Sequence, residues 1–301
     1  MNTGDRNLGI AAAFIAGITW GFLGLFVRGL NDHGISPVQI TCLRYIVVSF
    51  VLGLFLLLFD RNKLHIDKRT VAIILIIGIL GTAMNSMCYL GSMARISISL
   101  STVLQYLAPF IVVIPSVPLF GERMTVVKGV SVVIAFMGCV LCTGVISDPG
   151  SLDLIGFALG AASGLFFAIY TLGSKDLSRH SVSPITLMFY TSLVCCLVLM
   201  PFSDIPDVVS KTASDPELIL LIVGIGLLMT LLPFGLYNYA VGKIDVGMAS
   251  IITYVEPMAA TVVGFIFYSE AVSLESVIGI VAILFAVMLI NRGSSAGFEN
   301  D

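Results

Sequence analysis

One ionisable residue lies deep inside an apolar stretch: Glu256, directly before Pro257 in the run 246–268. An ionised carboxylate in such a setting is costly unless it is protonated or paired with a cation. It can bind a substrate ammonium or carry a proton. Alternatively, it pairs with Arg44 or accepts a free backbone donor, in a structural role. We favour a direct role of Glu256 in a binding site.

Polar side chains also recur at helical spacing on two neighbouring runs. Ser101 and Gln105 share one face of the run 97–120 with Ala108, and Thr82, Asn85 and Tyr89 share one face of the run 70–91. Such groups can orient a bound solute, or they can hydrogen-bond between helices as packing contacts. We favour the binding site for the set. The candidate binding residues are Trp20, Asn85, Tyr89, Gln105, Tyr170, Tyr237, Thr253 and Glu256.

Motifs for enzymatic chemistry are missing from the sequence. There is no phosphate-binding loop, no H-E-x-x-H and no G-x-S-x-G. Cys139 and Cys142 form a C-x-x-C pair, but they lie in an apolar stretch without His or acidic neighbours, so we interpret them as small apolar side chains. We therefore predict no catalytic residues, no cofactor and no metal.

The composition indicates a membrane protein. Hydrophobic residues make up 58% of the 301 residues and charged residues only 11%, against about 25% charged in soluble domains. A lipid bilayer is the natural solvent for such a surface. The net charge of −3 and the absence of a basic block argue against a nucleic-acid partner.

Apolar runs long enough to cross a bilayer of about 30 Å occur throughout the chain, because about 20 helical residues suffice. The predicted spans are 8–29, 37–59, 70–91, 97–120, 125–146, 153–174, 183–201, 217–240, 246–268 and 272–291. The longest connection, 202–216, is rich in Pro and Asp and is predicted to be an aqueous loop. The fold class is therefore all-α and integral to the membrane.

The basic residues predict the orientation of these spans. Eleven of the 15 Lys and Arg residues fall on the side of the N-terminus and three on the other side. Because an excess of Lys and Arg marks the cytoplasmic side, we expect a multi-pass protein of the cell (inner) membrane with both termini cytoplasmic.

The two halves of the chain resemble each other. Tyr106 aligns with Tyr254 and Pro109 with Pro257, each 148 positions later. Such a fixed offset indicates an internal repeat, with predicted units at 1–147 and 148–301. Each unit has an odd number of spans, five, so the second is inverted relative to the first. Inverted repeats are typical of secondary transporters.

The two prolines predict matched breaks in their helices, because each removes a backbone hydrogen bond. We consider them as hinges, or equally as static kinks. Glycines spaced four apart on the first and sixth runs, including Gly17 and Gly164, permit close helix contact. We expect this contact within a monomer, and a homodimer is the alternative.

These features together resemble the EamA-type members of the drug/metabolite transporter superfamily. The resemblance rests on AGITWGFLGLF near the N-terminus, a Ser-Pro followed by LRY, and the paired motifs QYLAPF…LFGERMTV and TYVEPM…FYSEAVS. It implies ten helices and a central cavity lined by the first, third, fourth, sixth, eighth and ninth. The chain departs from the family pattern at Phe167, where a Trp is common.

The combined expectation is a secondary transporter that works by alternating access. It would export or exchange a small polar or zwitterionic, amino-acid-like substrate. Two alternatives from other classes are an intramembrane enzyme and a membrane accessory subunit that transports nothing.

Overall fold

The structure, a computed structural model, describes residues 3–146, 153–269 and 271–296, and all regular structure within these ranges is helical. Nine helical segments there are long and apolar enough to cross a membrane, and Val126–Cys142 is a shorter apolar helix. All ten coincide with the predicted spans, which confirms the all-α membrane fold.

The helices of the two halves follow in chain order. The first half contains α1 (Thr3–Gly21), α2 (Leu23–Asp32), α3 (Pro37–Phe59), η1 (Arg61–Leu64), α4 (Lys68–Ile76), η2 (Ile77–Met84), α5 (Asn85–Met93), α6 (Ile98–Gln105), α7 (Ala108–Phe120) and α8 (Val126–Cys142). The second contains α9 (Leu154–Arg179), α10 (Pro184–Leu199), η3 (Met200–Phe202), α11 (Ile205–Ser214), α12 (Glu217–Gly226), η4 (Leu227–Leu231), α13 (Leu232–Lys243), α14 (Val246–Ile252), α15 (Val255–Tyr268) and α16 (Leu274–Ala296). The predicted boundary at 147/148 lies outside the described residues.

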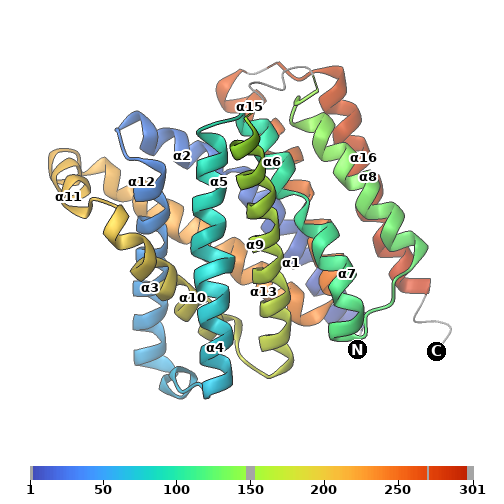
Figure 1. The fold of residues 1–301 in the computed structure, drawn as a ribbon, viewed down its shortest axis with the longest axis horizontal. Helices are drawn as coiled ribbons and strands as arrows, with labels where there is room; N and C mark the ends of the chain where they lie inside the picture. The colour runs from blue at the N-terminus through green and yellow to red at the C-terminus, as the bar shows by residue number, and fades with distance from the viewer. Residues whose placement is uncertain (1–2, 147–152, 270, 297–301) are drawn as a thin grey trace.

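The start of α1 and the end of α16 lie at the same end of the bundle (Figure 1), which we call the terminal end. Arg6 joins them by donating to the Asn291 carbonyl at 2.7 Å and to its side-chain oxygen at 3.0 Å. From this end α1 runs toward the opposite end, whereas α9, which begins the second half, runs back toward it. The two halves are therefore inverted.

The first helix of each half packs against the other half. The α1 helix packs against α13 and α15 of the second half, and α9 packs against α5, α6 and α7 of the first. At the edges, α3 pairs with α10 and α8 pairs with α16. Large apolar side chains of the edge helices, such as Phe50 and Phe285, are exposed and suit contact with lipid. The interior is thus built from the six spans that the resemblance placed around the centre.

Local backbone features recur in both halves. Each half contains a π-helical turn, η2 or η4, where a threonine hydroxyl donates to a carbonyl five residues earlier: Thr82 to Ile77 at 3.2 Å and Thr230 to Ile225 at 2.9 Å. Gly121 and Ser269 end α7 and α15 in the left-handed conformation. The repeat therefore extends from the sequence to the backbone.

Both fourth spans break where the prolines predict. The first is divided between α6 and α7, just before Pro109, and the second between α14 and α15, just before Pro257. Glycines of the other half lie against these breaks. A Cβ on Gly164 would come within 2.9 Å of the Leu104 carbonyl, and one on Gly17 within 2.4 Å of Val255. These glycines therefore pack within the chain.

The predicted aqueous loop at 202–216 contains a helix, α11. Its Val208 is buried in an apolar cluster with Leu30 and Leu218. Asp207 accepts hydrogen bonds from Gln39 at 2.9 Å and Lys211 at 2.7 Å. Burial of one apolar side chain and a satisfied acid in the first turn stabilise a helix that the polar composition did not indicate.

The contact between α8 and α16 gives a test of this packing. A Cβ on Gly138 would come within 2.8 Å of the Gly279 carbonyl, whereas nothing lies within 4 Å of one on Gly129 in the same helix. We expect Gly138→Ala to destabilise the protein by about 1–3 kcal/mol through overpacking. Gly129→Ala should be neutral or stabilising, by up to about 1 kcal/mol. Thermal unfolding in detergent measures both, and equal effects would contradict the packing.

Candidate functional site

Three of the predicted residues form a buried aromatic cluster. The Trp20 ring lies 5.6 Å from Tyr237 and 5.1 Å from Phe234, and Tyr170 lies 5.4 Å from Phe234. Phe167, at the position where the family commonly has Trp, joins this cluster. The cluster belongs to α1, α9 and α13 and lies in the interior of the bundle.

A second group is polar and partly exposed: Asn85, Tyr89, Gln105 and Glu256. The Asn85 amide donates to the Ser163 carbonyl at 2.8 Å. Each of these residues keeps some accessible surface. They come from α5, α6 and α15, which span both halves.

The Glu256 carboxyl lies beside the Tyr106 hydroxyl, which completes no hydrogen bond among the described residues. Tyr89 is within electrostatic range of the same carboxyl. The alternative partner, Arg44, lies over the ring of Tyr45 at 4.9 Å, and no ion pair joins it to Glu256 within the described part of the chain. A buried structural ion pair therefore does not account for Glu256.

The two halves place equivalent residues in unequal surroundings. Tyr89 hydrogen-bonds Thr102 at 2.9 Å, and its counterpart Tyr237 makes the equivalent bond to Ser250 at 3.2 Å. Yet Tyr89 and Thr102 are partly exposed, whereas Tyr237 and Ser250 are 0% and 2% exposed.

A third equivalent pair repeats this difference. Gln105 is partly exposed, and its counterpart Thr253 is 4% exposed with its hydroxyl donating to the Ser250 carbonyl at 2.8 Å. The exposed members belong to α5 and α6, whose connection lies at the opposite end (Figure 1). The buried members lie where α13 ends and α14 begins, near Lys243, which pairs with Asp5 of α1.

Two cavities lie near these elements. Tyr170 borders a cavity of only about 10 Å³, which it shares with Thr82 and Thr230 of the two π-helical turns. Such a space holds about one water. A larger cavity of about 510 Å³ lies between η1, α4 and the α9–α10 connection, and none of the predicted binding residues lines it. The larger cavity lies at the terminal end, beside η1 and the start of α4, and neither cavity is lined by Asn85, Tyr89, Gln105 or Glu256.

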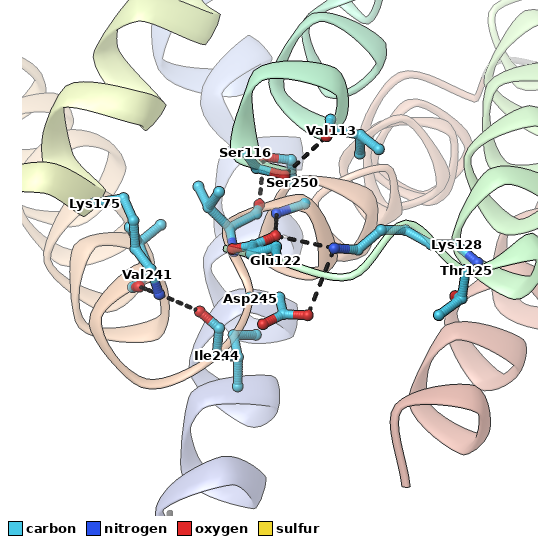
Figure 2. Close-up of polar contacts among 12 residues, drawn as sticks. Val113, Ser116, Glu122, Thr125, Lys128, Lys175, Val241, Ile244, Asp245 and Ser250 are labelled. Atoms are coloured by element: carbon cyan, nitrogen blue, oxygen red, sulfur yellow. Dashed lines mark hydrogen bonds and ion pairs between the residues drawn. The ribbon is translucent and has the colours of Figure 1, made fainter. Parts of the chain in front are cut away.

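Two polar features of the interior escaped the sequence analysis. Asn238, 3% exposed, donates to the Tyr170 hydroxyl at 2.8 Å. Glu122, expected to be solvated or to cap a neighbouring helix, does cap one but is 8% exposed and paired with Lys128 (Figure 2). Its repeat counterpart at 270 lies outside the described residues. The aligned Glu positions were the only signal for this cluster.

Comparison with known proteins gives the family. The model of the EamA-like transporter family matches residues 7–144 and again residues 154–292. The chain therefore belongs to the EamA-like transporter family, as the motifs suggested. It is a membrane transporter and not an enzyme, which removes the alternative of an intramembrane enzyme.

Several relatives align over most of the chain. An uncharacterized transporter of Archaeoglobus fulgidus is 29% identical over 86% of this chain and 90% of its own length. The threonine/homoserine exporter RhtA of Escherichia coli is 26% identical over 83% and 80%, and the uncharacterized inner membrane transporter YicL of Salmonella typhimurium 23% over 97% and 97%. A solved crystal structure at 18% identity has a TM-score of 0.75, with 94% of this chain and 96% of that chain covered, which shows a common fold.

The different burial of Tyr89 and Tyr237 can be tested by removing each hydroxyl group. Tyr237→Phe removes the hydroxyl that lies 3.1 Å from the buried Thr171 hydroxyl, its hydrogen-bond partner among the described residues. We expect a loss of about 1–3 kcal/mol in the free energy of unfolding, since a buried polar group is left unsatisfied. Tyr89→Phe should cost less than half as much, because water can replace the lost bond. Thermal unfolding of both variants decides, and an equal or larger loss for Tyr89→Phe would contradict the difference.

Proposed function

We propose that this transporter is a secondary transporter that moves a small polar or zwitterionic, amino-acid-like metabolite by alternating access, through export or exchange. The observation that carries the proposal is the unequal exposure of equivalent residues in the two halves. Tyr89, Thr102 and Gln105 are partly exposed, whereas Tyr237, Ser250 and Thr253 are buried.

The inverted repeat links this unequal exposure to a transport mechanism. Two halves of similar sequence can each adopt both arrangements, and exchanging these arrangements closes one end while it opens the other. The structure then represents one extreme, accessible from the opposite end. The breaks at Pro109 and Pro257 are the natural hinges, because few backbone hydrogen bonds resist bending there.

The substrate class follows from the side chains around Glu256. A carboxylate with no cationic partner suits a substrate ammonium, and the amide and phenol groups of Asn85, Gln105 and Tyr89 suit a carboxylate or hydroxyl. The aromatic cluster of Trp20, Tyr170 and Tyr237 offers apolar surface for a side chain. The activity for which RhtA is named, threonine and homoserine export, is in keeping with this class.

The orientation and location belong to the same proposal. Arg61, Lys63, Lys68 and Arg69 lie at the terminal end, which favours cytoplasmic termini. We therefore assign the exposed polar group to a path from outside the cell, and the protein to the inner membrane. We propose units 1–147 and 148–301 in a monomer, since the glycine ridges are occupied within the chain.

The sharpest test substitutes Glu256. In liposomes that contain the purified chain alone, we expect Glu256→Gln to lower uptake of zwitterionic amino acids at least about tenfold, since the change removes the charge that binds the ammonium. Radiolabelled exchange measures it. Wild-type transport with an unchanged dependence on pH in this variant would contradict the role.

The matched control is Glu217→Gln, a carboxylate at the exposed start of α12, which should transport normally. Reconstitution also tests the accessory-subunit alternative: a chain that moves no solute by itself, from a panel of amino acids and related metabolites, would favour that alternative.

A thermal-shift screen tests the substrate class independently. A ligand at 100 times its Kd stabilises the folded state by about 2.7 kcal/mol. We expect zwitterionic amino acids to raise the unfolding temperature of the wild type and to lose this effect in Glu256→Gln. Equal stabilisation of both proteins would show that the ligands bind elsewhere.

A further inference from the structure

A buried charge cluster joins the two halves at the terminal end (Figure 2). Glu122 follows α7, and its carboxylate accepts the backbone N–H groups of Val246 at 2.6 Å and Gly247 at 3.4 Å. The Lys128 ammonium donates to the same carboxylate at 2.9 Å and to Asp245 at 3.5 Å. Glu122 is 8% exposed and Lys128 2%. The first half therefore holds the beginning of α14 in the second half.

Charges of the right sign meet both helix ends at the α13–α14 turn. A carboxylate is favourable at a helix N-terminus and an ammonium at a C-terminus. Glu122 meets the first N–H groups of α14, which has no side-chain cap of its own. Lys175 of α9 donates to the Val241 carbonyl at 2.8 Å and the Ile244 carbonyl at 2.7 Å, at the end of α13. The turn is thus fixed from outside.

At the equivalent turn of the opposite end, the described residues include a local cap. There, Ser97 caps α6 locally by accepting from Leu100 N–H at 3.2 Å. Asp245, its counterpart 148 positions later, provides no such cap. The counterpart of Glu122 at position 270 lies outside the described residues, so the cap by an acidic side chain is described for the terminal end, where Tyr237, Ser250 and Thr253 are buried.

Hydrogen bonds connect the cluster to the buried residues. Val246 donates its N–H to Glu122, and its carbonyl accepts the Ser250 hydroxyl at 2.9 Å. Ser250 in turn bonds the Tyr237 hydroxyl at 3.2 Å. Displacing the start of α14 from Glu122 would therefore move Ser250 relative to Tyr237, where the path is closed.

We propose that Glu122 and Lys128 form a latch that closes the transport path at the terminal end, and that its release from α14 opens this end. The proposal rests on the alternating access argued above. A buried ion pair suits a reversible closure, because both charges regain water on release and this offsets much of the attraction lost. An apolar contact of the same size would not regain hydration and would hold the end shut.

The test is thiol labelling at Ala249→Cys, a fully buried position of α14 on the same face as Thr253. A membrane-impermeant maleimide is added to the terminal side of reconstituted vesicles, and the six native cysteines, all buried, give the background rate without the reporter. We expect Glu122→Gln to raise labelling of the reporter at least about tenfold. The same change should slow labelling of Thr102→Cys from the opposite side.

The paired variant Glu122→Gln with Lys128→Gln avoids leaving one charge buried alone, and should open the same end if the single variant does not fold. Thr125→Ala is the matched control, since Thr125 lies in the same connection but only caps α8, and labelling should stay at the wild-type rate. Unchanged reporter labelling in a folded latch variant would overturn the latch.

The experiments distinguish failure of the latch from failure of the proposed function. The labelling needs no substrate, so an intact response to latch release with normal transport in Glu256→Gln would count against the substrate site alone. A loss of transport in Glu256→Gln with no labelling response would leave that site standing and remove the latch.

Discussion

The structure depends on how two interrupted helices satisfy their backbone inside the bilayer, where no water completes a missing hydrogen bond. At the first break, Phe110 N–H bonds the Leu107 carbonyl, which leaves the Tyr106 carbonyl free of its usual partner. The Tyr254 hydroxyl, from the second break, donates to that carbonyl at 2.6 Å, and the two rings stack at 5.1 Å. The second half thus completes the interrupted helix of the first, and the stacked rings bring the two breaks together.

On either side of the contact between the two breaks, equivalent polar residues differ in exposure. Glu256 lies two residues beyond Tyr254, beside Tyr106, and the exposed polar residues of α5 and α6 extend from it toward the opposite end. In the other direction Tyr237, Ser250 and Thr253 are buried, and Glu122 holds the start of α14. The alternating access proposed above needs a binding group between two half-paths that open in turn, and Glu256 is the candidate for that group.

Much of this was predictable from the sequence, because hydropathy and spacing report directly on lipid contact and on repeats. The ten spans and the breaks before Pro109 and Pro257 follow from patterns within single helices. The inversion follows from the repeat and from the odd number of spans in each half. The burial of Glu122 does not, since it depends on which helix start from the other half meets the end of α7. Nor does the helix at 205–214, where one buried side chain, Val208, outweighs a polar composition.

The exposure of each polar stripe was equally hidden from the sequence. Tyr89 and Tyr237 occupy equivalent positions with equivalent hydrogen bonds, and only the packing of the whole bundle makes one accessible and the other buried. In the sequence the equivalent residues of the two halves look alike, whereas in the structure they differ in burial. The proposed function rests on this difference in burial.

The most direct test of reciprocal access is hydrogen–deuterium exchange of α6 and α14 in lipid nanodiscs, with and without a ligand that stabilises the protein. The account predicts opposite changes: any condition that raises exchange in α14 lowers it in α6. Exchange that rises or falls together in both helices would contradict it.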